Sequence, residues 1–158
     1  MTNFQHSVVL VKPDGIQRGL IGEIIHRFER KGLKLVGIKM MRLDDGVLEK
    51  WYEHHKNQPF FKDLKNYMQS SPIIAMLWEG IEAVETVRKL CGITLGRQAE
   101  DGSIRGDFAM SQQMNLIHAS DSQETAHKEE KLIFSPSEIF SYNKSEYLYV
   151  YSEEERKR

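Results

Sequence analysis

Residues 7–15 read SVVLVKPDG, and this stretch sets the beginning of the fold. The β-branched run of residues 7–12 is typical of a short buried strand, and the Pro-Asp-Gly tripeptide at 13–15 is a strong turn signal that ends it. Beyond the turn, residues 20–28 carry apolar side chains at helical spacing, and Gly32 can end that helix. A strand followed by an amphipathic helix is the first half of an α/β unit.

The same alternation continues along the chain. Further strands are expected at residues 33–43, 73–78 and 115–118, and further helices at 47–55, 60–68, 80–91 and about 122–132. Without the extra helices, the order is β-α-β-β-α-β. This order predicts a ferredoxin-like α/β (α+β) sandwich with a four-stranded antiparallel sheet and added helices.

Two segments near the last helix carry additional signals. Ser120 to Gln123 and Asp121 to Glu124 both have the spacing of a capping box, which predicts the start of the helix. Residues 92–114 are glycine-rich and charged and lack a clear period, so we expect a long loop there. Loops of that length are uncommon in compact domains unless they serve binding or assembly.

Composition limits the possible classes of protein. The 158 residues, 40% of them hydrophobic, predict one domain over 1–151, followed by a charged tail at 152–158. The formal net charge of -1 favours neither nucleic acid nor membrane as a partner, and the apolar runs are far shorter than the roughly 20 residues of a membrane span. A single cysteine and the lack of a visible signal peptide predict a cytoplasmic location.

The first candidate for chemistry is His118, which lies in the stretch NLIHASDS at 115–122. The small residues that follow it leave room for a ligand. His118 is expected at the end of the fourth strand, directly before a helix N-terminus that favours a phosphate or another anion. Histidine can act there as a nucleophile or a base, and the alternative is an ordinary hydrogen-bonded histidine at a strand end.

Two side chains on helices could act with His118. Glu129 could reach back to the imidazole and fix its tautomer, although Glu124 and Glu130 offer similar carboxylates. Arg88 falls inside the apolar stripe of residues 80–91 on a helical projection. Its guanidinium either extends to solvent from the helix end or makes a bidentate contact to a phosphate.

Other candidates come from the loops and the middle helices. Arg105 lies in the glycine-flanked stretch GSIRGDF, and Lys12 lies at the end of the first strand, where ligands of α/β sheets often bind. Tyr52, Phe60 and Leu64 have helical spacing, which is typical of core residues. The functional alternative is a platform on which a nucleobase stacks.

Three stretches together resemble one known family. NLIHASDS, with VKPDGIQRGLIGEII and IRGDF upstream, resembles the nucleoside diphosphate kinases in register over about residues 6–140. The resemblance implies that a nucleoside triphosphate phosphorylates His118 and that the phosphohistidine passes the phosphoryl group to a different diphosphate. This is a ping-pong reaction with little base specificity, in which Mg2+ enters with the nucleotide phosphates and no metal is held by protein ligands alone.

The resemblance also assigns roles to residues of this chain. Phe60 stacks on the base and Leu64 flanks it, while Lys12 and Asn115 bind the ribose hydroxyls. The implied phosphate contacts are His55, Arg88, Thr94 and Arg105. The implied catalytic residues are His118, Glu129, Ser120, Lys12 and Tyr52. The substrates are then nucleoside di- and triphosphates such as ATP, GTP, ADP and GDP.

The chain departs from the family pattern in the long loop, where both usual prolines are missing, at Gly96 and beside Gly102. Gln113 and Met114 replace the usual Gly-Arg, and Ala119 stands where glycine is commoner. Because this loop supports subunit contacts in the family, a homo-oligomer is expected, with a hexamer favoured over a tetramer or dimer. The rival hypotheses are a non-catalytic regulatory or scaffolding relative of the same fold, and an RNA-binding module, which the near-zero charge disfavours.

Overall fold

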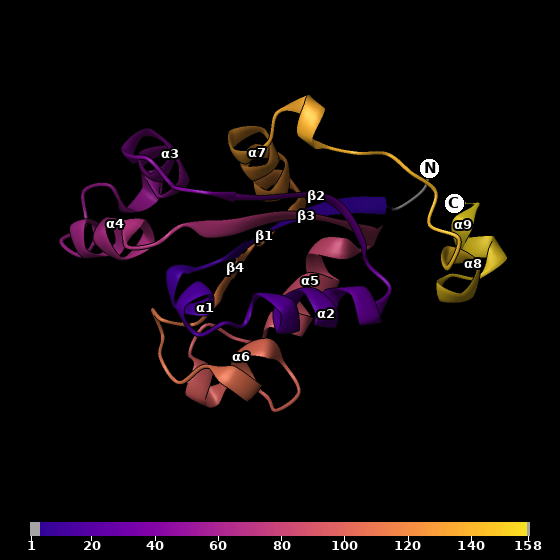
Figure 1. Cartoon of the computed structure of the whole chain (residues 1–158), viewed down its shortest axis with the longest axis horizontal. Helices are drawn as coiled ribbons and strands as arrows, with labels where there is room; N and C mark the ends of the chain where they lie inside the picture. Colours follow the sequence, from indigo (N-terminus) through magenta and orange to yellow (C-terminus); the bar gives the residue numbers. More distant parts are fainter. Residues whose placement is uncertain (1–3, 158) are drawn as a thin grey trace.

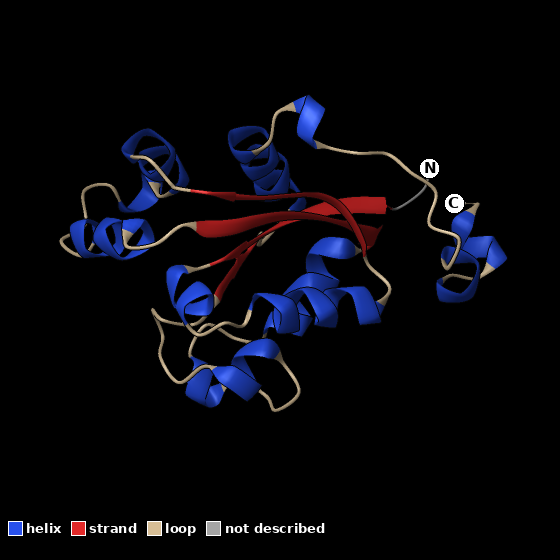
Figure 2. Cartoon of the chain, viewed as in Figure 1, coloured by secondary structure: helices blue, strands red, loops and turns tan. Residues whose placement is uncertain are grey.

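A computed structural model of the chain describes residues 4–157 and contains one antiparallel sheet of four strands, flanked by helices on both faces (Figures 1 and 2). The strands are β1 (Phe4–Val11), β2 (Lys34–Met41), β3 (Ile73–Ile81) and β4 (Ile117–Ala119), and their order across the sheet is β2-β3-β1-β4. This order and the antiparallel pairing confirm the predicted ferredoxin-like α+β sandwich.

The two faces of the sheet bury separate apolar clusters. On one face, α2 (Ile21–Lys31), α5 (Ala83–Cys91) and α6 (Ile104–Phe108) cover a cluster that includes Phe28 and Trp78. On the other face, α3 (Asp45–Trp51), α4 (Phe61–Gln69) and α7 (Gln123–Ile133) cover a second cluster around Leu77. Figure 1 shows the two helical layers on opposite sides of the sheet.

The first strand explains why its sequence is a continuous apolar run. Val9 and Val11 point into the first cluster, and Val8 and Leu10 point into the second. All four are at most 1% exposed, because each face of β1 is covered by helices.

Several predicted boundaries were wrong at the ends of elements. The Pro-Asp-Gly tripeptide belongs to a short helix, α1 (Pro13–Gln17), rather than to a simple turn, because proline is favourable in the first helical turn. The third strand continues to Ile81, so α5 begins at Ala83 instead of residue 80. Gly32 ends α2 as expected, in the left-handed conformation with φ 101°.

The segment 92–114 is not the featureless loop that the sequence predicted. It contains a 3₁₀ turn, η2 (Gly96–Gln98), and helix α6, whose N-cap Ser103 accepts a hydrogen bond from Gly106 N at 3.0 Å. Helices this short leave little periodicity in a sequence, which is why they were missed.

The fourth strand and the helix after it also differ from the expectation. β4 begins at Ile117 instead of residue 115 and ends at Ala119, so His118 lies in the middle of the strand. The N-cap of α7 is Ser122, whose Oγ accepts a hydrogen bond from Thr125 N at 3.0 Å. Neither Ser120 nor Asp121 is therefore the cap, because the cap lies nearer the helix.

The C-terminal part of the chain returns to the sheet. After η1 (Glu53–His55) in the middle of the chain, the remaining short helices are η3 (Pro136–Glu138), α8 (Tyr147–Val150) and α9 (Glu153–Arg156). The Tyr151 hydroxyl accepts a hydrogen bond from Ile81 N at 3.1 Å, and its ring lies 5.5 Å from that of Phe4. The tail is thus anchored at the end of β3, and within residues 4–157 no helix is long and apolar enough to cross a membrane.

Candidate active site

The pairing of β1 with β4 brings the end of one strand beside the start of the other. Lys12 N donates to Leu116 O at 2.8 Å, and the Lys12 ammonium donates to Asn115 Oδ1 at 2.9 Å. The Asn115 amide is held in turn, because its Nδ2 donates to Thr94 O at 2.9 Å and to Gln112 O at 2.8 Å. Two predicted residues, Lys12 and Asn115, are therefore in direct contact.

Arg105 fixes the segment 92–114 against the start of β4. Its buried guanidinium donates from Nη1 to Gly92 O at 2.8 Å, from Nη2 to Ile117 O at 2.7 Å and from Nε to Asn115 O at 3.3 Å. Burial lowers the pKa of Arg105, and the charge of Arg88 lowers it further. Since a guanidinium has five N–H donors, two remain for another acceptor.

The charge on Lys12 is poised near neutrality of the solution. Burial lowers the pKa of the Lys12 ammonium to about 8, and the nearby Arg105 adds to this shift, while Asp14 opposes it. A lysine with such a pKa loses its proton much more readily than an exposed one. Perturbed lysines of this kind cluster at functional sites.

His118 is held by a buried carboxylate from α7. The Nε2 atom of His118 lies 2.5 Å from Glu129 Oε2, and the second oxygen, Oε1, is buried without a hydrogen-bond partner in the described structure. The ring of Trp51 presents its edge or face to the imidazole, with centroids 4.9 Å apart and an interplanar angle of 73°. Of the three glutamates weighed from the sequence, Glu129 is the one in contact with His118.

Tyr52 and Ser120 flank this pair in different ways. Burial raises the pKa of the Tyr52 hydroxyl to about 12, and the charge of Glu129 contributes, so Tyr52 is a neutral donor at ordinary pH. Ser120 is fully buried, and its Oγ accepts from Val8 N at 3.0 Å. The Ser120 hydroxyl therefore joins β4 to β1.

The predicted base platform lies on the α3–α4 side. Three aromatic rings follow one another there: Tyr52 and His55 have centroids 6.4 Å apart, and His55 and Phe60 have centroids 5.4 Å apart. Phe60 is 49% exposed, whereas Leu64 is partly buried against the second apolar cluster. An exposed aromatic ring at a helix start is available for stacking.

Arg88 and Thr94 lie at the surface. The sequence placed Arg88 inside the apolar stripe of its helix, and this was wrong: Val84, Val87 and Cys91 are buried but Arg88 is exposed. The stripe is narrower than the projection suggested, and a guanidinium one position beyond its edge reaches solvent. Thr94 is also exposed, and its carbonyl holds Asn115.

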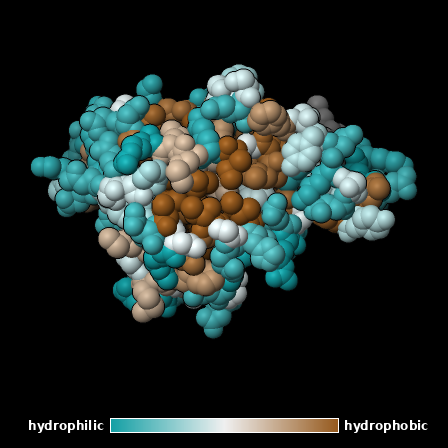
Figure 3. Space-filling view, viewed as in Figure 1, coloured by the Kyte–Doolittle hydropathy of each residue, from teal (hydrophilic) through white to brown (hydrophobic). Residues whose placement is uncertain are grey.

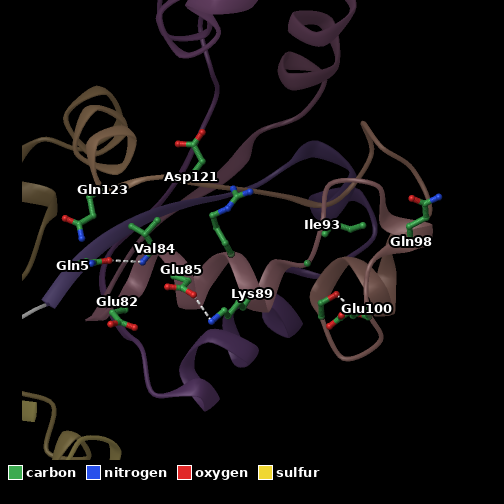
Figure 4. Close-up of a pocket in the computed structure, with 13 residues that line it drawn as sticks. Gln5, Glu82, Val84, Glu85, Lys89, Ile93, Gln98, Glu100, Asp121 and Gln123 are labelled. Carbon is green, nitrogen blue, oxygen red and sulfur yellow. Dashed lines mark hydrogen bonds and ion pairs between the residues drawn. The ribbon is translucent and has the colours of Figure 1, made fainter.

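Arg88 lines a cavity of about 1180 Å³. Figure 4 shows Val84, Glu85 and Lys89 of α5 along one side, Ile93 and Gln98 across from them, and Asp121 on a third side. The cavity walls also include Glu82 and Glu100, so carboxylates outnumber cations in it. Arg88 thus belongs both to this cavity and, through its electrostatic effect on Arg105, to the neighbourhood of the site.

Sequence reasoning did not assign a role in the site to Trp51, Asp14 or Leu116. Trp51 contacts the His118 ring but looked like a core residue of its helix. Asp14 was treated only as a turn residue, yet its Oδ2 accepts from Leu116 N at 3.0 Å. Leu116 has a φ of 75°, which no side-chain pattern indicates because leucine rarely adopts that conformation.

Comparison with known proteins agrees with this geometry. The family model described as nucleoside diphosphate kinase matches residues 5–139. A nucleoside diphosphate kinase of Parabacteroides distasonis is 48% identical over 151 residues, covering 96% of this chain and 99% of that protein. One of Staphylothermus marinus is 50% identical over 140 residues, with 89% and 99% covered.

Solved structures give the same result. A halophilic nucleoside diphosphate kinase from Halobacterium salinarum in complex with CDP has a TM-score of 0.90 and 42% identity, covering 93% of this chain and 98% of the other. A nucleoside diphosphate kinase family protein from Babesia bovis has the same TM-score and identity, covering 93% and 99%. The fold, the site and these relatives together define a nucleotide-binding phosphotransferase. The chain belongs to the nucleoside diphosphate kinase family, and its activity is the transfer of the terminal phosphoryl group from a nucleoside triphosphate to a nucleoside diphosphate.

Proposed function

We propose that this transfer runs by a ping-pong route in which Nδ1 of His118 is the nucleophile. The observation that carries the proposal is the short contact between His118 Nε2 and Glu129 Oε2, at 2.5 Å. An ionised carboxylate can only accept a hydrogen bond, so Nε2 carries the proton and Nδ1 keeps its lone pair. Glu129 therefore selects the tautomer that leaves Nδ1 free to attack.

In the first half-reaction, the lone pair of Nδ1 forms a bond to the terminal phosphorus of the triphosphate. The bond from that phosphorus to the bridging oxygen breaks, and its electron pair leaves with the nucleoside diphosphate. The imidazole then carries positive charge, which the carboxylate of Glu129 stabilises through the Nε2 proton. In the second half-reaction, a terminal oxygen of a different diphosphate attacks the same phosphorus, and His118 recovers its neutral ring.

Cations and neutral donors receive the rest of the nucleotide. Lys12 and Asn115 bind the ribose hydroxyls, and Arg88, Arg105, Thr94 and His55 contact the phosphates. Two free N–H donors on Arg105, and an exposed Arg88 close enough to lower its pKa, support this assignment because an anion would relieve their mutual repulsion. Tyr52 and Ser120 support the wall next to His118.

The base stacks on Phe60, and Leu64 flanks it. A platform of this kind accepts every base, because each has a π-face, and this supports a kinase with little base specificity. The Halobacterium salinarum relative is in complex with CDP. For this chain, the substrates are ATP, GTP, ADP, GDP and their counterparts.

Magnesium enters as part of the substrate, bridging phosphate oxygens. The donors around Lys12, Asn115 and Arg105 are nitrogen groups, whereas Mg2+ prefers oxygen ligands and keeps several waters. Within residues 4–157, no group of three or more His, Cys, Asp or Glu side chains is arranged to hold a metal ion. The ion therefore contributes charge neutralisation on the nucleotide, and the chain contributes orientation.

The chain also assembles with copies of itself, with a hexamer favoured over a tetramer or dimer. β2 pairs only with β3, so its other edge is free, and Ile38 and Met40 on it are 48% and 59% exposed. Figure 3 shows hydrophobic atoms gathered over the central part of this face. Exposed apolar edges of this kind favour association. The single cysteine, Cys91, is buried and supports a reducing, cytoplasmic setting.

The covalent intermediate provides the decisive test. The purified protein is mixed with γ-labelled ATP and magnesium without an acceptor, and the label is tested for lability to acid and stability to alkali. We expect label on the wild type, none on His118→Ala, and transfer of the label to added GDP or UDP. Nucleotide binding without labelling would contradict the proposal and favour a non-catalytic relative.

A further inference from the structure

The backbone two residues before His118 adopts an unusual conformation. Ile117 N donates to Asn115 O at 2.9 Å, which closes a three-residue γ-turn around Leu116. Leu116 has a φ of 75°, and among residues 4–157 the only other non-glycine with a positive φ is Glu82. A γ-turn with positive φ is strained for a residue with a side chain, and such strain persists only where surrounding structure holds it.

Residues 12–15 hold this turn from both sides. The carboxylate of Asp14 accepts from Leu116 N at 3.0 Å, and Lys12 N donates to Leu116 O at 2.8 Å. The second oxygen of Asp14 accepts a hydrogen bond from the Tyr67 hydroxyl of α4. A Cβ at Gly15 would lie 3.1 Å from Leu116 O and 2.7 Å from Val11 Cγ1, so the close approach needs glycine.

We propose that Asp14 is a positioning residue for the phosphoryl transfer, which it serves by clamping the strained turn at Leu116 with Tyr67 as its brace. The inference rests on the proposed route through His118. The turn sits between the two groups that build the site: Asn115, which Lys12 contacts, and Ile117, whose carbonyl accepts from Arg105. Without the clamp, Leu116 relaxes to negative φ and the register of β4 relative to β1 changes.

Asp14 has a second effect through its charge. The groups that set the pKa of Lys12 are Arg105 from α6, which lowers it, and Asp14 from α1, which raises it; the neutral amide of Asn115 is also in contact. Removing the charge of Asp14 moves the loss of the Lys12 proton to lower pH. A residue that only stabilised the fold would not move the pH profile in this way.

The test compares four variants. Asp14→Ala removes both hydrogen bonds, Asp14→Asn keeps them and removes the charge, and Tyr67→Phe removes only the brace. Glu138→Ala is the matched control, because the Glu138 carboxylate also accepts from a backbone N–H, of Ser135 at 2.9 Å, and from a side chain, of Lys39 at 2.8 Å. Glu138 lies outside the proposed site.

The readout is the single-turnover rate of His118 phosphorylation, at a temperature where circular dichroism shows each variant folded. We expect Asp14→Ala to be slower by about tenfold or more, since small displacements of reacting groups cost rate steeply. Asp14→Asn should stay within about threefold at pH 7, because its amide retains both contacts. It should also show the alkaline fall in kcat/KM at lower pH. Tyr67→Phe should fall between them.

Leu116→Gly separates the clamp from other roles of Asp14. Glycine adopts positive φ without strain, so Asp14→Ala should slow phosphorylation less in the Leu116→Gly background than in the wild type. The cavity left by the missing leucine is present in both members of that comparison and cancels. Should Asp14→Ala not fold, Asp14→Asn and Tyr67→Phe supply the comparison.

Each outcome bears on one statement. Equal rates for Asp14→Ala and Glu138→Ala, or an equal cost of Asp14→Ala in both backgrounds, would overturn the clamp and leave the phosphohistidine route intact. A wild type that takes no label overturns that route and, with it, the role given to Asp14. A slow Asp14→Ala with rescue by asparagine and a shifted pH profile supports the proposal.

Discussion

The two sides of the nucleotide site are built in opposite ways. Around His118, the side chains of Arg105, Asn115, Ser120 and Glu129 are at most 8% exposed and are hydrogen-bonded to the sheet or to each other. On the base side, every residue from 53 to 60 is exposed, and the aromatic rings touch only one another. The reacting groups are thus fixed in advance, while the base meets an adaptable surface.

This difference fits the demands of the reaction. Transfer between nucleotides requires the phosphorus and the imidazole to meet in one geometry, and preorganised donors lower that barrier most when they do not need to rearrange. Accepting every base requires the opposite, because hydrogen-bonding groups fixed against one base would reject the others. If the comparison is correct, changes on the His118 side should cost far more than changes on the base side.

The largest effect is expected from Arg105→Ala. It leaves the carbonyls of Gly92, Asn115 and Ile117 without their donor in a buried place. At about 1–3 kcal/mol for each unsatisfied group, the free energy of unfolding should fall by roughly 3–6 kcal/mol. Urea unfolding measures this loss.

Arg97→Ala is the control for that experiment. Arg97 also donates to a backbone carbonyl in the same segment, of Met110 at 3.3 Å, but it is exposed. We expect its loss to change stability by no more than about 0.5 kcal/mol, as for other surface substitutions. Equal effects of the two substitutions would contradict the view that the His118 side is held by buried hydrogen bonds.

The next effect concerns the tautomer of His118. In Glu129→Gln the side-chain amide can donate to Nε2, which would place the ring proton on Nδ1 and block the nucleophile. We expect kcat/KM to fall about 10²-fold, a typical magnitude for a positioned acid-base group, while the unfolding curve moves little. Steady-state kinetics with ATP and a diphosphate acceptor measure the fall.

Glu130→Gln provides the comparison for Glu129→Gln. Glu130 is the next residue of α7 and accepts from the His6 ring, with 2.9 Å between Glu130 Oε2 and Nδ1, instead of from His118. Its substitution should leave kcat/KM within about twofold. A comparable loss in both variants would mean that α7, and not the single contact at His118, is what the reaction needs.

Much of this arrangement could be predicted from the sequence, for physical reasons that differ between residues. The strands were predictable because β1 and β3 are buried on both faces and therefore read as apolar runs. His118 and Lys12 were predictable because small or turn-forming residues follow them at strand ends. Glu129 could not be separated from its neighbours, since helical spacing alone does not reveal which carboxylate faces the sheet.

The remaining features depend on tertiary contacts. The exposure of Arg88 follows from how closely α5 packs on β1, which a helical projection does not contain. The helix α6 is too short to show a period, and the strained turn at Leu116 exists because Asp14, 102 positions away in sequence, accepts its N–H. Strained conformations held by distant partners leave no local pattern.

On the base side, Phe60→Ala should have a smaller effect than either change near His118. Loss of one stacking ring costs about 1–3 kcal/mol of binding, and the loss should be nearly equal for ADP, GDP and CDP because stacking does not read the base edge. Isothermal titration with the three diphosphates measures it. Phe140→Ala is the control, since Phe140 is 64% exposed but lies on the C-terminal segment. A loss confined to one base would show that the platform is selective.

The smallest effect is a change with pH on the His118 side. The pKa of Lys12 is lowered to about 8 by burial and by Arg105, so its ammonium is charged below that pH and neutral above it. As pH rises through about 8, kcat/KM should fall by no more than about tenfold, because one charge near the phosphates is lost while the hydrogen bonds remain.

The two kinetic parameters should then separate. The pH profile of kcat/KM reports the free enzyme, whereas that of kcat reports the nucleotide complex. Bound phosphates add negative charge near Lys12 and raise its pKa, so the fall in kcat should occur at higher pH than the fall in kcat/KM. Lys12→Arg keeps its charge throughout and should show neither fall. Coincident profiles in the wild type would mean that Lys12 does not feel the phosphates, and that the preformed side of the site ends at Arg105.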